Sequence, residues 1–149
     1  MINIEIYTDG ACNQAKNTGG WSFLILENKE PKVQKSGALI NTTNNQCEMW
    51  AAIHALNEIS TMKFNEPINV ILYSDSAYLV NAFVEDWISN WEKNGWITAK
   101  KQSVLNKELW DMLIVLQKKL AVEFIQIRRC SNDYAKRVDK MAKTPSKVI

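Results

Sequence analysis

Apolar and polar side chains alternate with a period of two at the start of the chain. Isoleucines occupy every second position from Ile2 to Ile6, which is the pattern of a strand with one buried face. Two further strand-like stretches, separated by a polar turn, cover residues 20–26 and 32–40. Residues 1–40 are therefore expected to form an antiparallel meander of three strands. The first strand is expected to end at Asp9.

A helical pattern follows the meander. Thr43 and Gln46 match a capping box, in which each side chain bonds the backbone of the other residue. Apolar residues from Met49 to Ile59 then recur at helical spacing, which predicts a helix over about residues 44–60. The remaining predicted elements are a buried strand at 68–73, helices at about 76–91 and 103–120, a strand at 122–127 and a helix at 132–143.

The order of these elements predicts a single α/β domain over residues 1–149. A chain of 149 residues is long enough to bury one core and leaves little room for a second. The sheet is expected to be mixed and five-stranded, with three antiparallel strands and then two parallel strands, flanked by helices. Its crossover connections are expected to be right-handed.

The composition argues against several classes of protein. Hydrophobic residues make up 46% of the chain, yet no window approaches the ~18 apolar residues of a membrane span. The N-terminus lacks the pattern of a secretory signal. The three cysteines, an odd number without C-x-x-C spacing, predict neither a disulfide framework nor a zinc cage. A cytoplasmic, monomeric protein without a membrane partner is therefore expected.

The net charge of +2 is too small to indicate a nucleic-acid partner by itself. The charge is nevertheless uneven, because residues 118–149 contain nine Lys and Arg against three Asp and Glu, an excess of +6. A solvated helix face explains this excess as well as a nucleic-acid surface does.

Three acidic residues lie at the edges of apolar elements. Asp9 follows the first strand, Glu48 lies about one turn into the first long helix, and Asp75 follows the fourth strand. Ligand sites in open α/β sheets lie beyond strand ends, and carboxylates gathered there repel one another unless a cation neutralises them. Oxygen ligands favour hard cations such as Mg²⁺ or Mn²⁺. Taken singly, each acid is more often a helix cap or a surface charge.

The short sequence segments around these acids resemble those of a known family. Tyr-Thr-Asp-Gly-Ala-Cys at 7–12, Thr-Thr-Asn-Asn-Gln-Cys-Glu at 42–48 and Tyr-Ser-Asp-Ser at 73–76 resemble three signature segments of type I ribonuclease H, in that family's order and at its intervals. A tryptophan- and lysine-rich stretch within about residues 84–107 resembles the family's basic protrusion. The resemblance spans nearly the whole chain.

The resemblance implies a ribonuclease H-like fold and an endoribonuclease that hydrolyses the RNA strand of RNA–DNA hybrids. It implies that Asp9, Glu48 and Asp75 hold two Mg²⁺ or Mn²⁺ ions in a two-metal mechanism. The fourth acid of the family matches Asp139, in Arg-Val-Asp-Lys-Met-Ala. Asp133 competes for this role, although its position at a helix start suits an acid that serves the helix dipole.

The resemblance also implies contacts to the hybrid. Minor-groove contacts near the cut, which distinguish RNA by its 2′-hydroxyl, are expected from Cys12, Asn44, Asn45 and Gln46. Thr43 belongs to a pocket for a DNA phosphate, besides capping its helix. Contacts of the protrusion to the phosphate backbone are expected from Trp87, Trp91, Lys93, Trp96, Lys100 and Lys101, although Trp87 and Trp91 suit the hydrophobic core equally well.

The chain departs from the family at the loop before the last acid. Many members carry a His there, whereas residues 128–132 contain none, and His54, the sole His, lies in the middle of a predicted helix where a structural role is expected. Arg128 and Arg129 are candidates to hold the scissile phosphate instead. Two alternative functions stay open: a non-catalytic hybrid- or duplex-binding module, and another nuclease or strand-transfer enzyme of the same fold.

Overall fold

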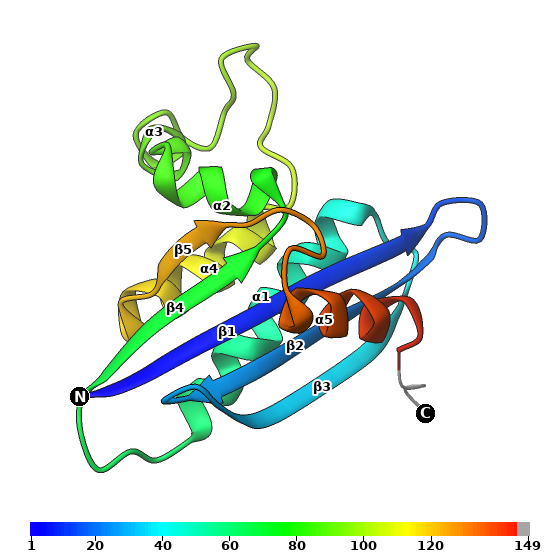
Figure 1. Cartoon of the computed structure of the whole chain (residues 1–149). Coiled ribbons are helices and arrows are strands. Elements are labelled where there is room, and N and C mark those ends of the chain that lie inside the picture. Colours follow the sequence, from blue (N-terminus) through cyan, green and yellow to red (C-terminus); the bar gives the residue numbers. More distant parts are fainter. Residues whose placement is uncertain (146–149) are drawn as a thin grey trace.

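A computed structural model describes residues 1–145 as one sheet flanked by helices on both faces (Figure 1). The sheet has five strands in the order β3-β2-β1-β4-β5. Strands β1, β2 and β3 pair antiparallel, and β4 and β5 continue the sheet parallel to β1. The strands are β1 (Ile2–Asn13), β2 (Thr18–Glu27), β3 (Glu30–Ile40), β4 (Ile68–Ser74) and β5 (Glu123–Gln126). The predicted mixed sheet is confirmed.

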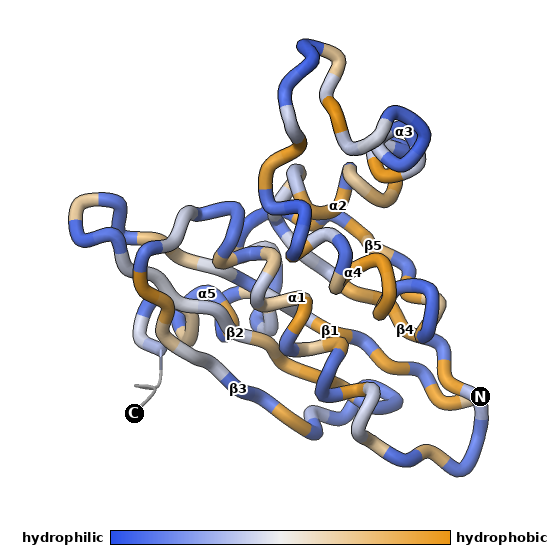
Figure 2. The backbone as a smooth tube through the Cα atoms, turned by 180° about the vertical axis from the view of Figure 1, so that it is seen from behind, coloured by the Kyte–Doolittle hydropathy of each residue, from blue (hydrophilic) through white to orange (hydrophobic). Residues whose placement is uncertain are grey.

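The helices divide between the two faces of the sheet. Helix α1 packs on β1 and β2 and against α4, whereas α5 packs on the opposite face of the same two strands (Figures 1 and 2). The helices are α1 (Asn44–Thr61), α2 (Ala77–Val84), α3 (Trp87–Lys93), α4 (Lys107–Leu120) and α5 (Asp133–Lys143). The predicted capping box of Thr43 and Gln46 is present at the start of α1.

Strand alternation gives the sheet two apolar faces. Ile4 and Ile6 belong to the large core cluster with α1 and α4, whereas Tyr7 belongs to the smaller cluster with Ala135 and Val138 of α5. Hydrophobic residues, orange in Figure 2, accordingly recur along the strands of the sheet. Among the described residues, no helix is long and apolar enough to cross a membrane.

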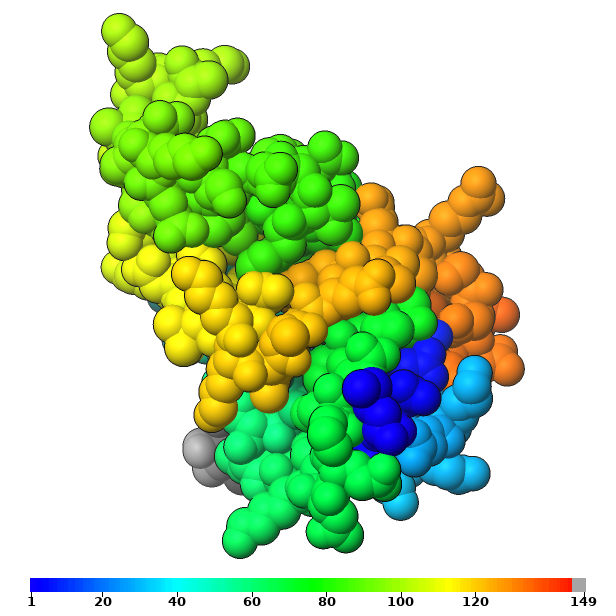
Figure 3. All heavy atoms as spheres, turned by 90° about the vertical axis from the view of Figure 1, so that its left-hand side faces the viewer, coloured from blue at the N-terminus to red at the C-terminus, as the bar shows by residue number. Residues whose placement is uncertain are grey.

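Two predicted helices are wrong in extent. The helix expected over 76–91 is two helices, because Asp86 adopts a left-handed backbone conformation (φ 59°) between α2 and α3. The helix expected from Ser103 begins at Lys107, because Ser103 instead forms an isolated β-bridge with Ile97. Apolar spacing does not detect a single residue of positive φ, so the sequence pattern runs across such breaks. The segment from α3 to Asn106 stands out from the body (Figures 1 and 3).

The position of Asp9 also differs from the prediction. Strand β1 continues to Asn13, so Asp9 lies within the strand and pairs with Ser22 of β2. The parallel pairing of β1 with β4, however, ends at Tyr7 and Tyr73. Asp9 therefore lies just beyond the point where β4 stops pairing with β1. The space that opens there beside β1 can hold a ligand, as the space beyond a strand end does in other α/β sheets.

Candidate active site

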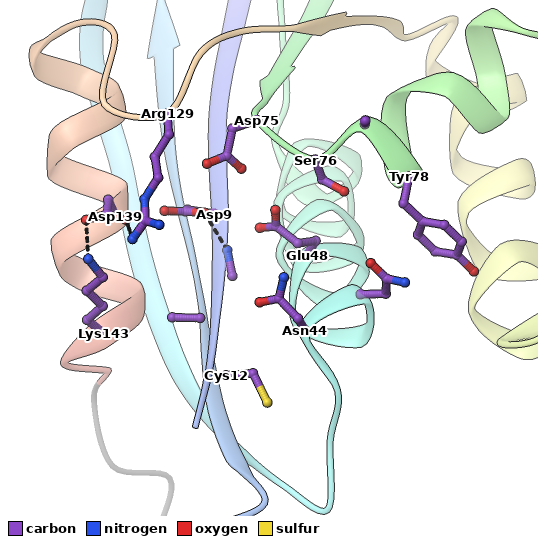
Figure 4. A pocket seen from close by; sticks show the side chains of 14 residues that line it. Asp9, Cys12, Asn44, Glu48, Asp75, Ser76, Tyr78, Arg129, Asp139 and Lys143 are labelled. Atoms are coloured by element: carbon purple, nitrogen blue, oxygen red, sulfur yellow. Dashed lines mark hydrogen bonds and ion pairs between the residues drawn. The ribbon is translucent and has the colours of Figure 1, made fainter. Parts of the chain in front are cut away.

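Three carboxylates from separate elements converge at this opening. Asp9 comes from β1, Glu48 from the second turn of α1, and Asp75 from the residue after β4 (Figure 4). One carboxylate oxygen of each lies within 4.8 Å of those of the other two. Asp9 and Glu48 are only 6% and 5% exposed. The predicted convergence of these three acids is present in the structure.

Gly10 allows α1 to approach β1 closely enough for this convergence. A Cβ atom at Gly10 would lie 2.5 Å from the carbonyl carbon of Cys47 and 2.5 Å from the backbone nitrogen of Glu48. Side-chain alternation directs this missing Cβ toward α1. Only a glycine therefore permits the backbone of the residue before Glu48 to rest against the strand beside Asp9.

Burial and mutual repulsion make the ionised cluster costly without a cation. Burial, then the nearby charge of Asp75, raises the pKa of Asp9 to about 7. Burial, then the charges of Asp9 and Asp75, raises the pKa of Glu48 to about 10. In addition, Glu48 Oε1 is buried without a hydrogen-bond partner among the described residues. An all-oxygen donor set with an unpartnered buried oxygen fits a hard divalent cation.

A fourth carboxylate, Asp139 of α5, lies next to Asp9 and forms ion pairs with two positively charged side chains. Its Oδ1 lies 3.2 Å from a guanidinium nitrogen of Arg129, and its Oδ2 lies 3.0 Å from Lys143 Nζ (Figure 4). Partial burial acts to raise the pKa of Asp139, but hydrogen bonds from Lys143 and Asp9 and both ion pairs lower it overall. Asp133 is exposed in the first turn of α5, which is consistent with a role at the helix N-terminus.

The raised pKa values predict that the metal-free protein loses stability as pH rises. Between the ordinary carboxyl pKa values near 4 and the folded values of about 7 for Asp9 and about 10 for Glu48, the folded chain binds more protons than the unfolded chain. The free energy of unfolding should therefore fall from pH 5.5 to pH 9. Thermal unfolding in a chelator should show a lower Tm at pH 9, by ~3 °C for each kcal/mol lost.

Glu48→Gln provides the control for this experiment. The amide keeps the shape of the side chain but cannot ionise. The Tm of the variant should therefore fall much less between pH 5.5 and pH 9 than the Tm of the original chain. Mg²⁺ should raise the Tm of the original chain more at pH 9 than at pH 5.5, because ionised carboxylates bind the cation. A Tm with the same pH dependence in both proteins would show that the cluster carries no such cost.

The carboxylates lie in a pocket of about 500 Å³ that also contains some of the predicted substrate-binding residues. Cys12, Asn44 and Asn45 line it. Arg129, a candidate for the scissile phosphate, lines it as well. Ser76, Tyr78 and Lys143 also line it, although none of these three was among the predicted site residues. Lys143 could have been found from its i, i+4 spacing to Asp139, which puts both side chains on one face of a helix.

Gln46 lies outside this pocket lining, and its amide is occupied within the protein. Its Oε1 accepts from the backbone N–H of Thr43 at 3.3 Å, and its Nε2 donates to Asn106 Oδ1 at 3.0 Å. Asn106 in turn donates to the Tyr78 hydroxyl at 3.4 Å. The amide therefore ties the start of α1 to the start of α4. Thr43 is exposed and caps α1.

The predicted protrusion residues lie away from the carboxylate pocket. Trp87, Trp91 and Trp96 are partly buried and pack against the hydrophobic core, with ring centroids of neighbouring pairs 6.2 and 5.8 Å apart. Trp91 also packs against the buried Trp110 at 5.6 Å. The exposed residues of this region include Lys93, Lys100 and Lys101. The tryptophans therefore contribute to packing, and the lysines remain available to a ligand.

His54 and Arg128 were also discussed in the sequence analysis, and the structure shows what surrounds each of them. His54 stacks on Trp21 with ring centroids 3.9 Å apart and contacts Trp50 at 5.6 Å. Burial lowers the pKa of His54, and the predicted structural role is consistent with this packing. Arg128 is exposed and lines a small hollow beside Asp9 and Asp75.

Comparison with solved structures shows a shared fold. One similar structure is a type 1 ribonuclease H with the type 2 active-site motif. The superposition covers 94% of this chain and 70% of that protein's chain, with a TM-score of 0.77 at 20% sequence identity. A ribonuclease H1 in complex with an RNA/DNA hybrid matches 95% of both chains, with a TM-score of 0.71 at 21% identity. At these identities the likeness concerns the architecture.

Sequence comparison identifies the family. Residues 2–147 match the RNase H family. Ribonuclease H of Acetivibrio thermocellus is 45% identical, over 95% of this chain and 93% of the relative. Ribonuclease H of Moorella thermoacetica is 42% identical, over 96% of this chain and 91% of the relative. Agreement of this extent, over nearly the full length of both proteins, means that the chain belongs to the RNase H family.

Proposed function

We propose that this protein is an endoribonuclease that hydrolyses the RNA strand of RNA–DNA hybrids. The observation that carries the proposal is the convergence of Asp9, Glu48 and Asp75 within 4.8 Å, with one buried oxygen of Glu48 lacking a partner. Support comes from near-full-length relatives named Ribonuclease H at 42–45% identity. The intact acids argue against a module that binds without cleaving.

The four acids would hold two Mg²⁺ or Mn²⁺ ions. When bound, such ions neutralise the carboxylates and supply Lewis-acid stabilisation to the attacking and leaving oxygens of a phosphodiester. Asp9 is the central residue of the site, because the charge of Asp75 and hydrogen bonds with Glu48 and Asp139 all act on its carboxyl. Because Asp9 and Glu48 are almost fully buried, their carboxylates would be held in fixed positions toward the ions.

Asp139 would exchange its ion-pair partners when a cation binds. Its two oxygens are paired with Arg129 and Lys143, whose positive charges would repel a cation bound at Asp139 and so favour their turning away. Both side chains line the pocket. Once released, they would face a scissile phosphate, to which arginine donates in a bidentate geometry and lysine as a point charge. Arg129 would then lie in the loop in which many family members carry the His that this chain lacks.

The remaining predicted contacts divide between the pocket and the protrusion. Cys12, Asn44 and Asn45 line the pocket, where short polar groups would reach the 2′-hydroxyls across the minor groove. Thr43 would meet a DNA phosphate. Lys93, Lys100 and Lys101 would contact the backbone from a protrusion at residues 84–107. All four carboxylates come from one chain, so a single domain acting as a monomer is sufficient.

A cleavage assay with three labelled substrates tests the proposed function. Matched RNA–DNA hybrid, duplex DNA and duplex RNA are incubated with the protein in Mg²⁺, in Mn²⁺ and in a chelator. We expect the RNA strand of the hybrid to be cut in the presence of either metal. We expect no cleavage in the chelator. Binding of the hybrid without cleavage in either metal would instead indicate a non-catalytic module, and cleavage of duplex DNA would indicate another nuclease of this fold.

A further inference from the structure

A hollow of about 470 Å³ lies where α2, α3 and α4 approach β5. Figure 3 faces this side of the molecule and shows α2 and α3 in green, the end of α4 in yellow and β5 in orange. Among the described residues, none lines both this hollow and the carboxylate pocket, and no residue predicted to contact the hybrid lines the hollow. A ligand bound in the hollow would therefore leave the carboxylates accessible.

The lining of the hollow is largely apolar and belongs to the hydrophobic core. The rings of Phe83 in α2 and Phe124 in β5 stack with their centroids 4.3 Å apart and their planes at 2°. Ile88 of α3 and Ile114 of α4 also line the hollow and pack in the same core cluster. Val84, at the end of α2, lines it and is 58% exposed. Because core packing fixes these side chains, an apolar group would enter the hollow with little rearrangement.

The hollow also reaches the open edge of the sheet. Strand β5 is the last strand in the sheet, and among the described strands it pairs with β4 alone. The backbone N–H of Ile127 donates to the backbone oxygen of Ser74 in β4 at 2.9 Å. Backbone groups of successive residues point to opposite sides of a strand, so those of Phe124 and Gln126 point away from β4. Since Glu123 and Phe124 line the hollow, a strand edge lies directly beside an apolar depression.

The charged residues of the hollow are mostly acidic. Asp86, Glu92 and Glu123 line it and are exposed, and Lys118 is the only basic residue among the described residues that line it. None of these three acids forms an ion pair with another described residue. The chain as a whole has a net charge of +2, so the negative charge here is a local feature. Such a surface repels a nucleic-acid backbone and attracts Lys and Arg side chains.

We propose that this hollow docks an extended segment of a partner protein, with one apolar side chain in the hollow and Lys or Arg beside it. The segment would lie along the outer edge of β5 as an added strand and form main-chain hydrogen bonds with Phe124 and Gln126. In an extended segment, side chains two positions apart point to the same side, so basic residues two positions from the apolar one would face the acids. Because β5 has four residues, the contact is short and is expected to be weak and reversible.

Selection from a displayed library of random peptides on the unchanged full chain tests the docking site. We expect enriched peptides to carry an aliphatic or aromatic residue with Lys or Arg two positions away. When binding of the synthesised peptides is measured by fluorescence anisotropy, Val84→Ser and Glu123→Lys should each weaken it about tenfold. Val115→Ser and Glu30→Lys are the matched controls, because Val115 is 65% exposed on α4 and Glu30 is exposed in β3, both outside the hollow. The controls should bind like the unchanged protein.

Methylation of single backbone nitrogens in a selected peptide tests the added strand. It should weaken binding at every second position and have little effect between them, because alternate N–H groups would face β5. The inference is overturned if no peptide is enriched, if the enriched peptides are acidic or bind Glu123→Lys as well as Glu30→Lys, or if methylation has no alternating effect. Displacement of the peptide by an RNA–DNA hybrid would place it on the substrate surface and would also overturn the inference. Peptide binding requires no cleavage, so a failure of the proposed function would be seen separately.

Discussion

Replacing Asp9 by Asn should lower the rate of hybrid cleavage by about a thousandfold or more, because Asp9 contributes to neutralising every cation that the cluster holds. The side chain is 6% exposed and interacts with Glu48, Asp75 and Asp139. An amide of the same size preserves the packing but removes one negative charge and one strong ligand oxygen. The measurement is single-turnover cleavage of a labelled hybrid at saturating Mg²⁺.

Hybrid affinity should change much less than the cleavage rate in the same variant. The predicted backbone and minor-groove contacts are made by other residues, so the loss should appear in kcat rather than in hybrid binding. Asp133→Asn is the control, because Asp133 is exposed at the start of α5, and it should cleave at nearly the original rate. Asp139→Asn should resemble Asp9→Asn. Equal activity of Asp9→Asn and the original protein would exclude the carboxylate cluster as the catalytic centre.

Glu48→Gln should separate activity from stability. Glu48 has the most strongly raised carboxyl pKa in the cluster, about 10, because it is buried near two other acids. Removing its charge should stabilise the metal-free protein at alkaline pH. The same change should abolish most of the activity. A residue whose loss stabilises the fold and removes the reaction serves the chemistry and not the packing.

The sequence predicted the chemistry of the site better than its local geometry. The three acids and their order along the chain were recognisable from short motifs, and the sheet followed from alternation and from the β-branched run at Ile68–Tyr73. The position of Asp9 was wrong, because β1 pairs with β2 for six residues beyond the end of its pairing with β4. Strand length in a sheet depends on the partner strand, which a single stretch of sequence does not contain.

Side-chain partners far apart in the sequence were also beyond prediction. Gln46 was assigned to the hybrid by resemblance, yet its amide bonds Asn106, sixty positions later in the chain. The pairing of Arg129 with Asp139 likewise depends on how the loop before α5 folds back over β1. These contacts are set by tertiary structure, whereas caps such as Thr43 are set within one turn and were predicted correctly.

Replacing Gly10 by Ala should be the most damaging change that leaves every polar group of the site intact. Its Cβ would lie 2.5 Å from backbone atoms of Cys47 and Glu48, and backbone cannot turn aside as a flexible side chain can. Relief requires α1 to move away from β1, which we expect to cost about 3 kcal/mol by overpacking. A displacement of Glu48 by about 1 Å from Asp9 should also lower cleavage about a hundredfold.

Gly37→Ala is the matched control for this substitution. A Cβ atom there would lie equally close, 2.5 Å, to the ring of Trp21 on the β2–β3 hairpin, away from the carboxylates. Both variants should unfold at lower temperature or denaturant concentration than the original protein. At a temperature where both are fully folded by circular dichroism, Gly37→Ala should retain its cleavage rate and Gly10→Ala should not. Equal rates for the two folded variants would mean that the close approach of α1 to β1 serves stability alone, and that the spacing of Asp9 and Glu48 does not limit the reaction.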